Sequence, residues 1–217
     1  HLQEPLMPGD SLRIKYQLTS LSNTFLMDRS LILENGTFFN NSVFPSLAYE
    51  DGVELVDNRV REKYKLAPRD RMADPRDSSK LGNTYISKDA DWIDFEAIVS
   101  TSPDQIAIAP GYLQKEWEEN GKKYFHYKMD SPILNFYSFI SAKYEVKKEK
   151  VNGKNMEIYY HKGHEYNLDR MMASIKKSLG YYESNFSPYQ FNQLRIIEFP
   201  STHGTFAQAF ANTVPFS

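Results

Sequence analysis

The sequence predicts a mainly β protein, in which an antiparallel, sandwich-like β domain precedes a short α/β segment. Two observations predict the β domain. Tyr and Phe are abundant, with 15 and 14 copies among 217 residues, and both favour half-buried strands. Two Asn-Gly pairs, Asn120–Gly121 and Asn152–Gly153, each separate two apolar runs, as tight hairpins do. A third observation predicts the α/β segment, because after His161 the apolar spacing changes from a strand period to a helical period.

The first half of the β domain is predicted from alternating apolar residues. Leu12–Leu18 alternates without fault, which is typical of a strand with one buried face. A second strand is expected at Ser30–Glu34, and Thr37–Phe39 is expected to return beside it after an Asn-Gly turn. The next two expected strands are Asp91–Ser100 and Gln105–Ala109, with a Ser-Pro-Asp turn between them.

Two hairpins complete the predicted β domain. Leu113–Trp117 and Lys123–Lys128 flank the first Asn-Gly pair, while Ser141–Lys147 and Met156–Tyr160 flank the second. Both residues of such a pair accept positive φ, so each pair favours a type I′ turn. We therefore expect antiparallel β structure throughout residues 1–161, packed as a sandwich and incomplete at its start.

A polar region interrupts the predicted strands. Val53–Tyr64 has the pattern of a short helix. The stretch after it, residues 65–83, is poor in apolar side chains, and its charge is densest at Pro68–Lys80. Such a stretch cannot contribute much to a core, so we expect a surface insertion there.

Residues 162–217 are predicted to form a separate unit, the beginning of a second domain. Apolar residues share one helical stripe across residues 168–183, and Asn167 occupies the N-cap position. An apolar strand at 193–199 and a glycine-containing loop at 203–217 follow the helix. A helix feeding a strand marks a change of architecture, so the boundary is placed near residue 162. The stripe consists of Leu168, Met171, Met172, Ile175, Leu179 and Tyr182.

Charge and composition exclude several classes of protein. The chain carries 26 Lys and Arg against 28 Asp and Glu, a net charge of −2, so no nucleic-acid partner is expected. It has no cysteine, which excludes disulfides, thiolate metal sites and a cysteine nucleophile. No apolar run approaches the roughly 20 residues that span a bilayer, and no signal peptide is recognisable. From the abrupt start and end of the sequence, we expect the chain to be a soluble fragment of a larger protein.

Histidine spacing near residue 161 suggests a metal site without completing one. His161 and His164 flank a turn, and Glu165 follows them. A zinc helix of the His-Glu-x-x-His type needs its second histidine at position 168, where this chain has Leu168. Two imidazoles also fall short of the three protein ligands of a catalytic zinc. We therefore interpret the pair as structural or solvated, and predict no metal ligands in this chain.

The remaining polar and aromatic candidates are interpreted as surface or packing residues. Asp89, Asp91 and Asp94 resemble an acid–base cluster, but they straddle a strand start, where charge usually marks a solvated face. His203 lies in the terminal loop, where a lone histidine is more often polar surface than a functional group. Packing roles are expected for His126, Trp92 and Trp117. No catalytic residue is predicted.

A series of short segments occurs in an order known from one enzyme family. They are Phe44–Tyr49, Ala90–Pro103, Ile108–Leu113, Pro132–Phe139, Tyr159–His164, Phe186–Tyr189 and Leu194–Pro200. In this order they resemble the amino-terminal β domain, and the entry into the thermolysin-like domain, of zinc aminopeptidases of the alanyl aminopeptidase and leukotriene A4 hydrolase type. Tyr124–Met129 and Phe206–Phe210 are similar to runs in a divergent bacterial branch fused to an ABC-type permease.

The resemblance implies a substrate-binding loop. In this family, a Gly-Ala-Met-Glu-Asn loop holds the substrate backbone, and its Glu binds the free α-amine. The matching stretch here is Gly204, Thr205, Phe206, Ala207 and Gln208. Ala207 stands where the Glu would be, and a methyl group cannot form the charge-assisted hydrogen bond that a carboxylate offers an ammonium. Aminopeptidase specificity is therefore in doubt.

The resemblance also implies a cofactor, partners and a location. Zinc is expected in the full-length parent and not in this chain, because the zinc helix and its downstream Glu would follow residue 217. The chain alone is therefore expected to be inactive. Its expected role is to wall the peptide-substrate cleft and support the catalytic domain of a bacterial membrane protein, on the extracytoplasmic side. Expected partners are the rest of the parent polypeptide, including its permease part, and a peptide substrate. The alternative is a β-sandwich scaffold or binding module without peptidase activity.

Overall fold

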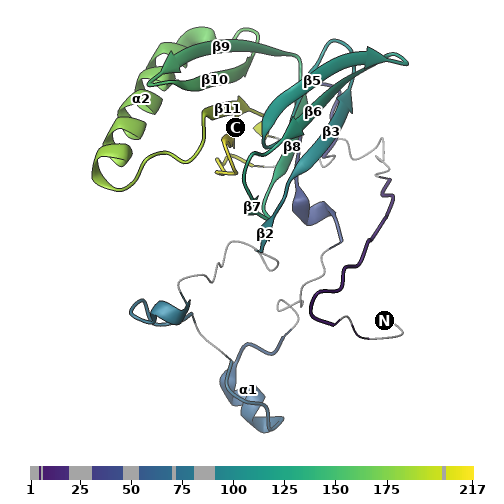
Figure 1. The fold of residues 1–217 in the computed structure, drawn as a ribbon, viewed down its shortest axis with the longest axis vertical. Coiled ribbons are helices and arrows are strands. Elements are labelled where there is room, and N and C mark those ends of the chain that lie inside the picture. The colour runs from purple at the N-terminus through teal and green to yellow at the C-terminus, as the bar shows by residue number, and fades with distance from the viewer. Residues whose placement is uncertain are drawn as a thin grey trace.

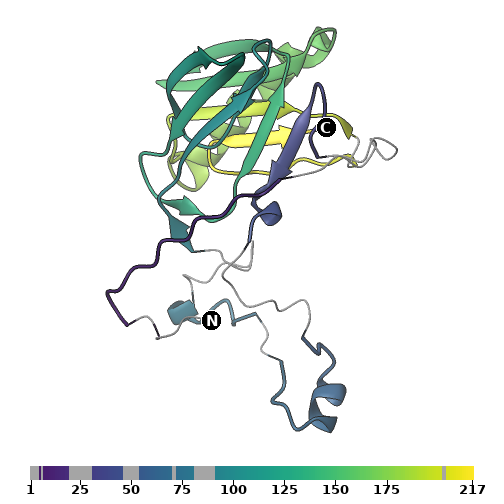
Figure 2. The ribbon, with the colours of Figure 1, turned by 90° about the vertical axis from the view of Figure 1, so that its right-hand side faces the viewer.

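The computed structural model describes residues 5, 7–19, 31–45, 54–69, 72–80, 91–201 and 204–217. Their structure confirms a mainly β fold, with antiparallel sheets and one long helix in the C-terminal part. Figures 1 and 2 show the strands gathered at one end of the molecule, with helix α2 on the outside and the α1 region extending away. Among the helices of these residues, none has the length and apolar character needed to cross a membrane.

The strand expected at 12–18 is not present. Residues 11–19 form no strand, and no described strand pairs with them. The apolar side chains of the alternating pattern are about half exposed, at 50% for Leu12, 47% for Ile14 and 53% for Tyr16. Alternation shows which face of a strand could be buried, but a neighbouring strand must supply the hydrogen bonds. The local pattern does not specify that neighbour.

The strand expected at 30–34 is also wrong over its described part, residues 31–34, which form a bend and a turn. The Thr37 hydroxyl accepts from the Leu33 N–H at 3.2 Å and donates to the Leu33 carbonyl at 3.3 Å, so this turn is closed locally. The return strand is confirmed as β1, Thr37–Asn40. It pairs antiparallel with β8, Ser138–Ala142, so a distant strand replaces the expected local partner.

The helix expected at 53–64 is present but shorter, because α1 spans Asn58–Lys63. The Asp57 carboxylate accepts from the Arg59 N–H at 2.8 Å, and this N-cap sets the start of the helix. The following stretch lies on the surface over its described residues, which include only a 3₁₀ turn at Ser78–Lys80. Residues 53, 70–71 and 81–83 lie outside the described residues.

The β domain consists of two three-stranded antiparallel sheets and a small ribbon. The first sheet has the order β1-β8-β4, the second β3-β6-β5, and the ribbon pairs β2 with β7. The single strand expected at 91–100 is divided, because Trp92 pairs with Leu134 in the ribbon whereas Glu96 pairs with Lys128 in the second sheet. The bounds are β2 Trp92–Ile93, β3 Glu96–Thr101, β4 Ile106–Ile108, β5 Tyr112–Glu119, β6 Lys122–Lys128 and β7 Ile133–Leu134.

Both predicted hairpin turns are confirmed. Asn120 and Gly121 connect β5 and β6 with φ values of 50° and 72°, as a type I′ turn requires. Asn152 and Gly153 connect β9, Tyr144–Val151, to β10 in the same way, with φ values of 50° and 82°. The chain makes each turn with two residues that tolerate positive φ, so the register next to each turn follows from local sequence. Further from its turn, the β5–β6 pair shifts register between Leu113 and Lys115.

A four-stranded mixed sheet, in the order β12-β11-β10-β9, contains the C-terminal part of the chain. β10 (Lys154–His161) runs through helix α2 (Leu168–Asn185) into β11 (Gln193–Glu198), and β10 and β11 are parallel. The sheet therefore spans the boundary expected near residue 162. Part of the expected loop at 203–217 is a strand, because β12 (Thr213–Phe216) pairs parallel with β11. Asn167 is at the N-cap of α2, although its side chain makes no capping hydrogen bond.

Three apolar cores hold these layers together. α2 packs on one face of the mixed sheet through Met156, Ile158 and Met172. The opposite face of that sheet packs on the first three-stranded sheet, through residues such as Ile197 and Ile140. The third core lies between the two three-stranded sheets and comprises Phe95, Ala107, Ala109, Phe125, Tyr127, Met129, Ile133 and Phe191. The mixed sheet thus has α2 on one face and the β domain on the other (Figure 1).

Candidate functional site

The stretch with the sequence-predicted binding residues folds back on β12 as a short antiparallel edge, which we call the edge segment, Phe206–Phe210. Ala207 is bridged to Phe216, and Phe210 to Thr213. The Gln208 N–H donates to the Pro215 carbonyl at 3.1 Å. Among the described residues, the edge segment is therefore the outermost paired backbone on the β12 side of the mixed sheet.

Two alanines of the edge segment present their backbone to the outside. The two hydrogen bonds that flank the Ala207–Phe216 pair come from Gln208 N and Ser217 N, which makes it a non-hydrogen-bonded pair. In antiparallel pairing, the N–H and C=O groups of such a residue point away from the partner strand. The same alternation turns the backbone of Ala209 outward, since Phe210 is hydrogen-bonded to Thr213. Both alanines are exposed, and no described residue bonds to their backbone groups.

Side chains hold the start of this stretch in place. The Phe206 ring packs against Phe199 at 4.9 Å and against Phe38 at 5.7 Å between ring centroids. The Ser217 hydroxyl accepts from the Phe206 N–H at 3.1 Å and donates to the Gly204 carbonyl at 3.0 Å. Thr205 is exposed and Gln208 is half-buried. Of the five predicted residues, Phe206, Ala207 and Gln208 thus lie on the edge segment, and Gly204 and Thr205 lead into it.

The turn that ends the edge segment rests on a buried arginine that the sequence analysis did not single out. Asn212 adopts a φ of 45° and is fully buried, with its side-chain oxygen 3.0 Å from Arg195 Nη2. The same nitrogen lies 3.0 Å from the Thr213 hydroxyl, 2.7 Å from the Ala109 carbonyl and 2.9 Å from the Gly111 carbonyl. Arg195 therefore connects the edge turn to the β domain.

An aromatic ring also lies beside the buried Arg195 side chain. Its guanidinium lies 5.2 Å from the centre of the Tyr127 ring, a cation–π contact. Burial raises the pKa of the Tyr127 hydroxyl to about 12, although the nearby guanidinium opposes this shift. Within the described part of the chain, Arg195 Nε and Asn212 Nδ2 are buried without a hydrogen-bond partner. In the sequence, a charged residue at an inward-facing position of an otherwise apolar strand could have identified Arg195 as a candidate.

The two histidines expected to be structural or solvated lie at the carboxyl ends of the parallel strands. The Glu198 carboxylate accepts from the His161 N–H at 2.8 Å and contacts Nδ1 of His164. Burial lowers the pKa of His161, and the Glu198 carboxylate opposes this shift. His164 is exposed, and Glu165 accepts from the Gly163 N–H at 3.0 Å in the turn.

Zinc, the cofactor that the sequence resemblance implies, finds no matching ligand set in the described residues. No group of three or more His, Asp or Glu side chains is arranged there to hold a metal ion. The carboxylate nearest the two histidines is already engaged by the His161 backbone and the His164 ring. No chemical step is therefore assigned to zinc in this part of the chain.

The remaining sequence candidates that the structure describes do not gather into one site. Asp91 and Asp94 are exposed, while Asp89 and His203 lie outside the described residues. His126 is half-buried on β6 and contacts Glu96 at 2.6 Å. Trp117 stacks on Tyr124 at 5.1 Å, which confirms a packing role in the hairpin. The packing role expected for Trp92 is wrong, because its two-residue strand lies at a margin and leaves it 68% exposed.

No protein-family model matches the chain, and a search of curated proteins found no significant match.

Proposed function

We propose that this chain forms one wall of a peptide-binding cleft in an aminopeptidase-like protein, and that the edge segment binds an extended peptide by strand addition. The observation that carries the proposal is the outward-facing backbone of Ala207 and Ala209. An exposed strand edge binds peptides through main-chain hydrogen bonds, independent of most side chains. The sequence resemblance assigns substrate contact to Gly204–Gln208, which overlaps the edge segment at Phe206, Ala207 and Gln208.

The chemistry of the edge segment defines which part of a peptide it recognises. Ala207 and Ala209 offer small side chains and backbone groups, with no carboxylate for a free α-amine. We therefore infer recognition of peptide backbone rather than of a free amino terminus. Zinc binding and bond cleavage are assigned, under this proposal, to other residues of a bacterial, permease-fused parent protein.

The test measures peptide binding to wild-type protein and to Ala207→Pro. Proline removes the outward N–H of residue 207, which has no partner in the described chain, so the fold should persist. Loss of one backbone hydrogen bond should weaken the binding of an extended octapeptide by about fivefold. Ala207→Val keeps the N–H and should bind as the wild type does. Fluorescence anisotropy with a labelled peptide gives both values.

Two outcomes would contradict strand addition. One is equal affinity of Ala207→Pro and wild type, with thermal unfolding unchanged. The other is a strong preference for a peptide with a free amine over its acetylated form, which would require an acidic group at the site.

A scaffold module without peptidase activity is the second candidate, and Ala207 in place of the family's Glu favours it. Peptide binding to the edge segment is common to both candidates. Zinc content and cleavage of an aminoacyl anilide by the full-length parent protein separate them. Stoichiometric zinc with cleavage supports the peptidase, and peptide binding with neither supports the scaffold.

A further inference from the structure

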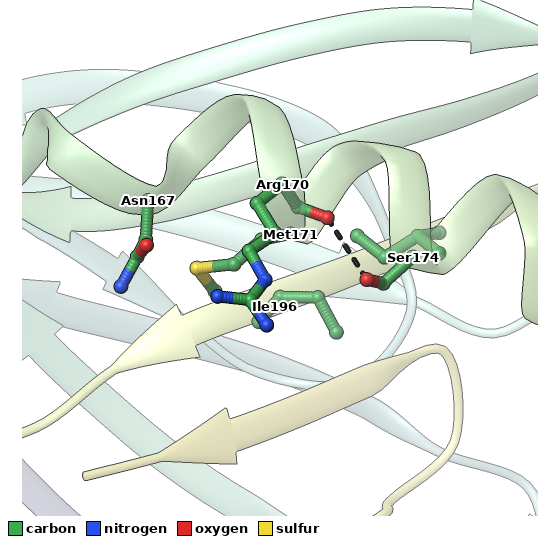
Figure 3. A pocket seen from close by; sticks show the side chains of 6 residues that line it. Asn167, Arg170, Met171, Ser174 and Ile196 are labelled. Atoms are coloured by element: carbon green, nitrogen blue, oxygen red, sulfur yellow. Dashed lines mark hydrogen bonds between the residues drawn. The ribbon is translucent and has the colours of Figure 1, made fainter.

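A groove lies beside α2, over the neighbouring strand of the mixed sheet (Figure 3). Its volume is about 370 Å³. Met171, Ile175 and Ile196 contribute its apolar surface, while Arg170 and Ser174 are polar residues on its α2 side. We call it the α2 groove, lined by Asn167, Arg170, Met171, Ser174, Ile175 and Ile196.

The groove exists because one helix is too narrow for this sheet. Strands are about 4.8 Å apart and a helix is about 10 Å wide, so α2 can cover roughly two of the four strands. α2 packs on β10 through Met156 and Ile158, and the same cluster takes in Val151 of β9 and the partly buried Leu194 of β11. The corresponding faces of β11 and β12 keep half-buried apolar side chains, Ile196 and Val214.

Ion pairs show that the two flanks of α2 differ. On the β9 side, Asp169 pairs with Lys147, and Lys176 pairs with Glu149. Near the end of the helix, Glu183 pairs with Lys154 at 2.9 Å. These contacts satisfy the charges on that flank and anchor the helix to the β9–β10 hairpin.

The groove side of α2 carries two cations, Arg170 and Lys177, without an ion-pair partner among the described residues. Arg170 lines the groove, and Lys177 lies about two turns further along the same side of the helix. No described residue forms an ion pair with either of them. The half-buried Met171 and Ile196 lie beside Arg170, so an apolar floor adjoins a basic rim. This combination, an apolar centre with a charged rim, is characteristic of a protein interface.

We propose that the α2 groove binds an acidic amphipathic helix of a partner protein. Such a helix would lie beside α2 across β11 and β12, place its apolar stripe on Met171 and Ile196, and direct carboxylates at Arg170 and Lys177. A second helix of similar width would complete the cover of the four-stranded sheet. The groove lies on the face of the mixed sheet, whereas the edge segment lies at its margin, so this proposal does not depend on the proposed function.

The test uses two synthetic helical peptides of about 18 residues, the length of α2. Both carry leucines at helical spacing; one has glutamates along its flanks and the other has lysines at the same positions. Fluorescence anisotropy measures their binding to wild type, to Arg170→Glu/Lys177→Glu and to Met171→Gln. We expect the acidic peptide to bind wild type, and the charge reversal to weaken this binding at least about tenfold. Met171→Gln should weaken it as well, because it removes apolar contact without lowering helix propensity.

The matched control is Lys63→Glu/Lys122→Glu, which makes the same change in net charge at exposed positions on α1 and β6. It should leave the affinity for the acidic peptide unchanged, as should Ala207→Pro. No binding at about 1 mM peptide, equal binding of the lysine peptide, or an unchanged affinity in the charge reversal would each overturn the proposal. Dimerisation that the charge reversal abolishes would also overturn it, because the occupant would then be a second copy of this chain.

Discussion

Arg195 and Ala109 are 86 positions apart in the chain, yet the guanidinium of the first lies 2.7 Å from the carbonyl oxygen of the second. This contact joins the mixed sheet to the connection between β4 and β5. The arginine is buried among neutral oxygens, so its charge is balanced by hydrogen bonds and the Tyr127 ring rather than by a direct carboxylate partner. It therefore holds the edge turn and the β domain in a single arrangement.

Replacing Arg195 with methionine should destabilise the protein by about 3 kcal/mol, because several buried oxygens lose their donor. Urea unfolding followed by tryptophan fluorescence measures the change. Arg59→Met is the control, since the Arg59 side chain is 91% exposed and should cost less than about 0.5 kcal/mol. Equal losses in the two variants would contradict the structural role of Arg195.

Two substitutions at Asn212 separate the contribution of its backbone conformation to stability from that of its side chain. Asn212→Gly and Asn212→Ala both remove the amide that contacts Arg195, but only alanine retains a Cβ at a φ of 45°. The alanine variant should therefore be less stable than the glycine variant by about 1 kcal/mol. Thermal unfolding measures this difference. Equal stability of the two variants would show that the left-handed conformation is not required.

Gly111 and Gly163 form a matched pair of glycines, with φ values of +99° and +98°. A Cβ at Gly111 would lie 2.7 Å from the Lys128 backbone carbon, whereas a Cβ at Gly163 would meet nothing within 4 Å. Both alanine variants are strained at positive φ, but only Gly111→Ala adds a clash with backbone. It should lower the unfolding temperature clearly more than Gly163→Ala does, and calorimetry of both variants tests this order.

His161 should make stability depend on pH. Burial lowers its pKa in the folded protein below the usual 6.5, so the unfolded chain binds the proton more readily. Its contribution to stability is therefore complete above about pH 6.5 and is lost as the pH falls below that value. Nearby, the Glu198 carboxylate opposes the shift and His164 adds to it.

The measurement compares urea unfolding of wild type and His161→Gln at about pH 7.5 and about pH 5. Wild type should lose more stability than the variant on acidification. His164→Gln is the control, because it removes the second imidazole, at an exposed position in the same turn, and keeps His161. The prediction would be contradicted if the wild type gained stability relative to His161→Gln on acidification.

Local sequence predicted the elements whose geometry depends on a few adjacent residues. Asn120–Gly121 and Asn152–Gly153 accept positive φ, so both hairpin turns could be located without tertiary information. The strand expected at Ser141–Lys147 is divided at Lys143 between β8 and β9, which join different sheets. The helical stripe from Leu168 to Tyr182 likewise placed α2 to within a few residues. Sequence resemblance located the edge segment, but the outward direction of its backbone could not be predicted, because it depends on pairing with β12.

Only the tertiary structure decided which strands become neighbours. Leu12–Leu18 has a faultless strand pattern and forms no strand, whereas Thr213–Phe216, expected to be loop, becomes β12 because β11 accepts it in parallel. In the sequence, Arg195 only interrupts an apolar strand. In the folded protein, Ala109, Gly111 and Asn212 surround its guanidinium and bind it. Turn and helix preferences act between adjacent residues, whereas strand pairing and the burial of a charge depend on groups that only folding brings together.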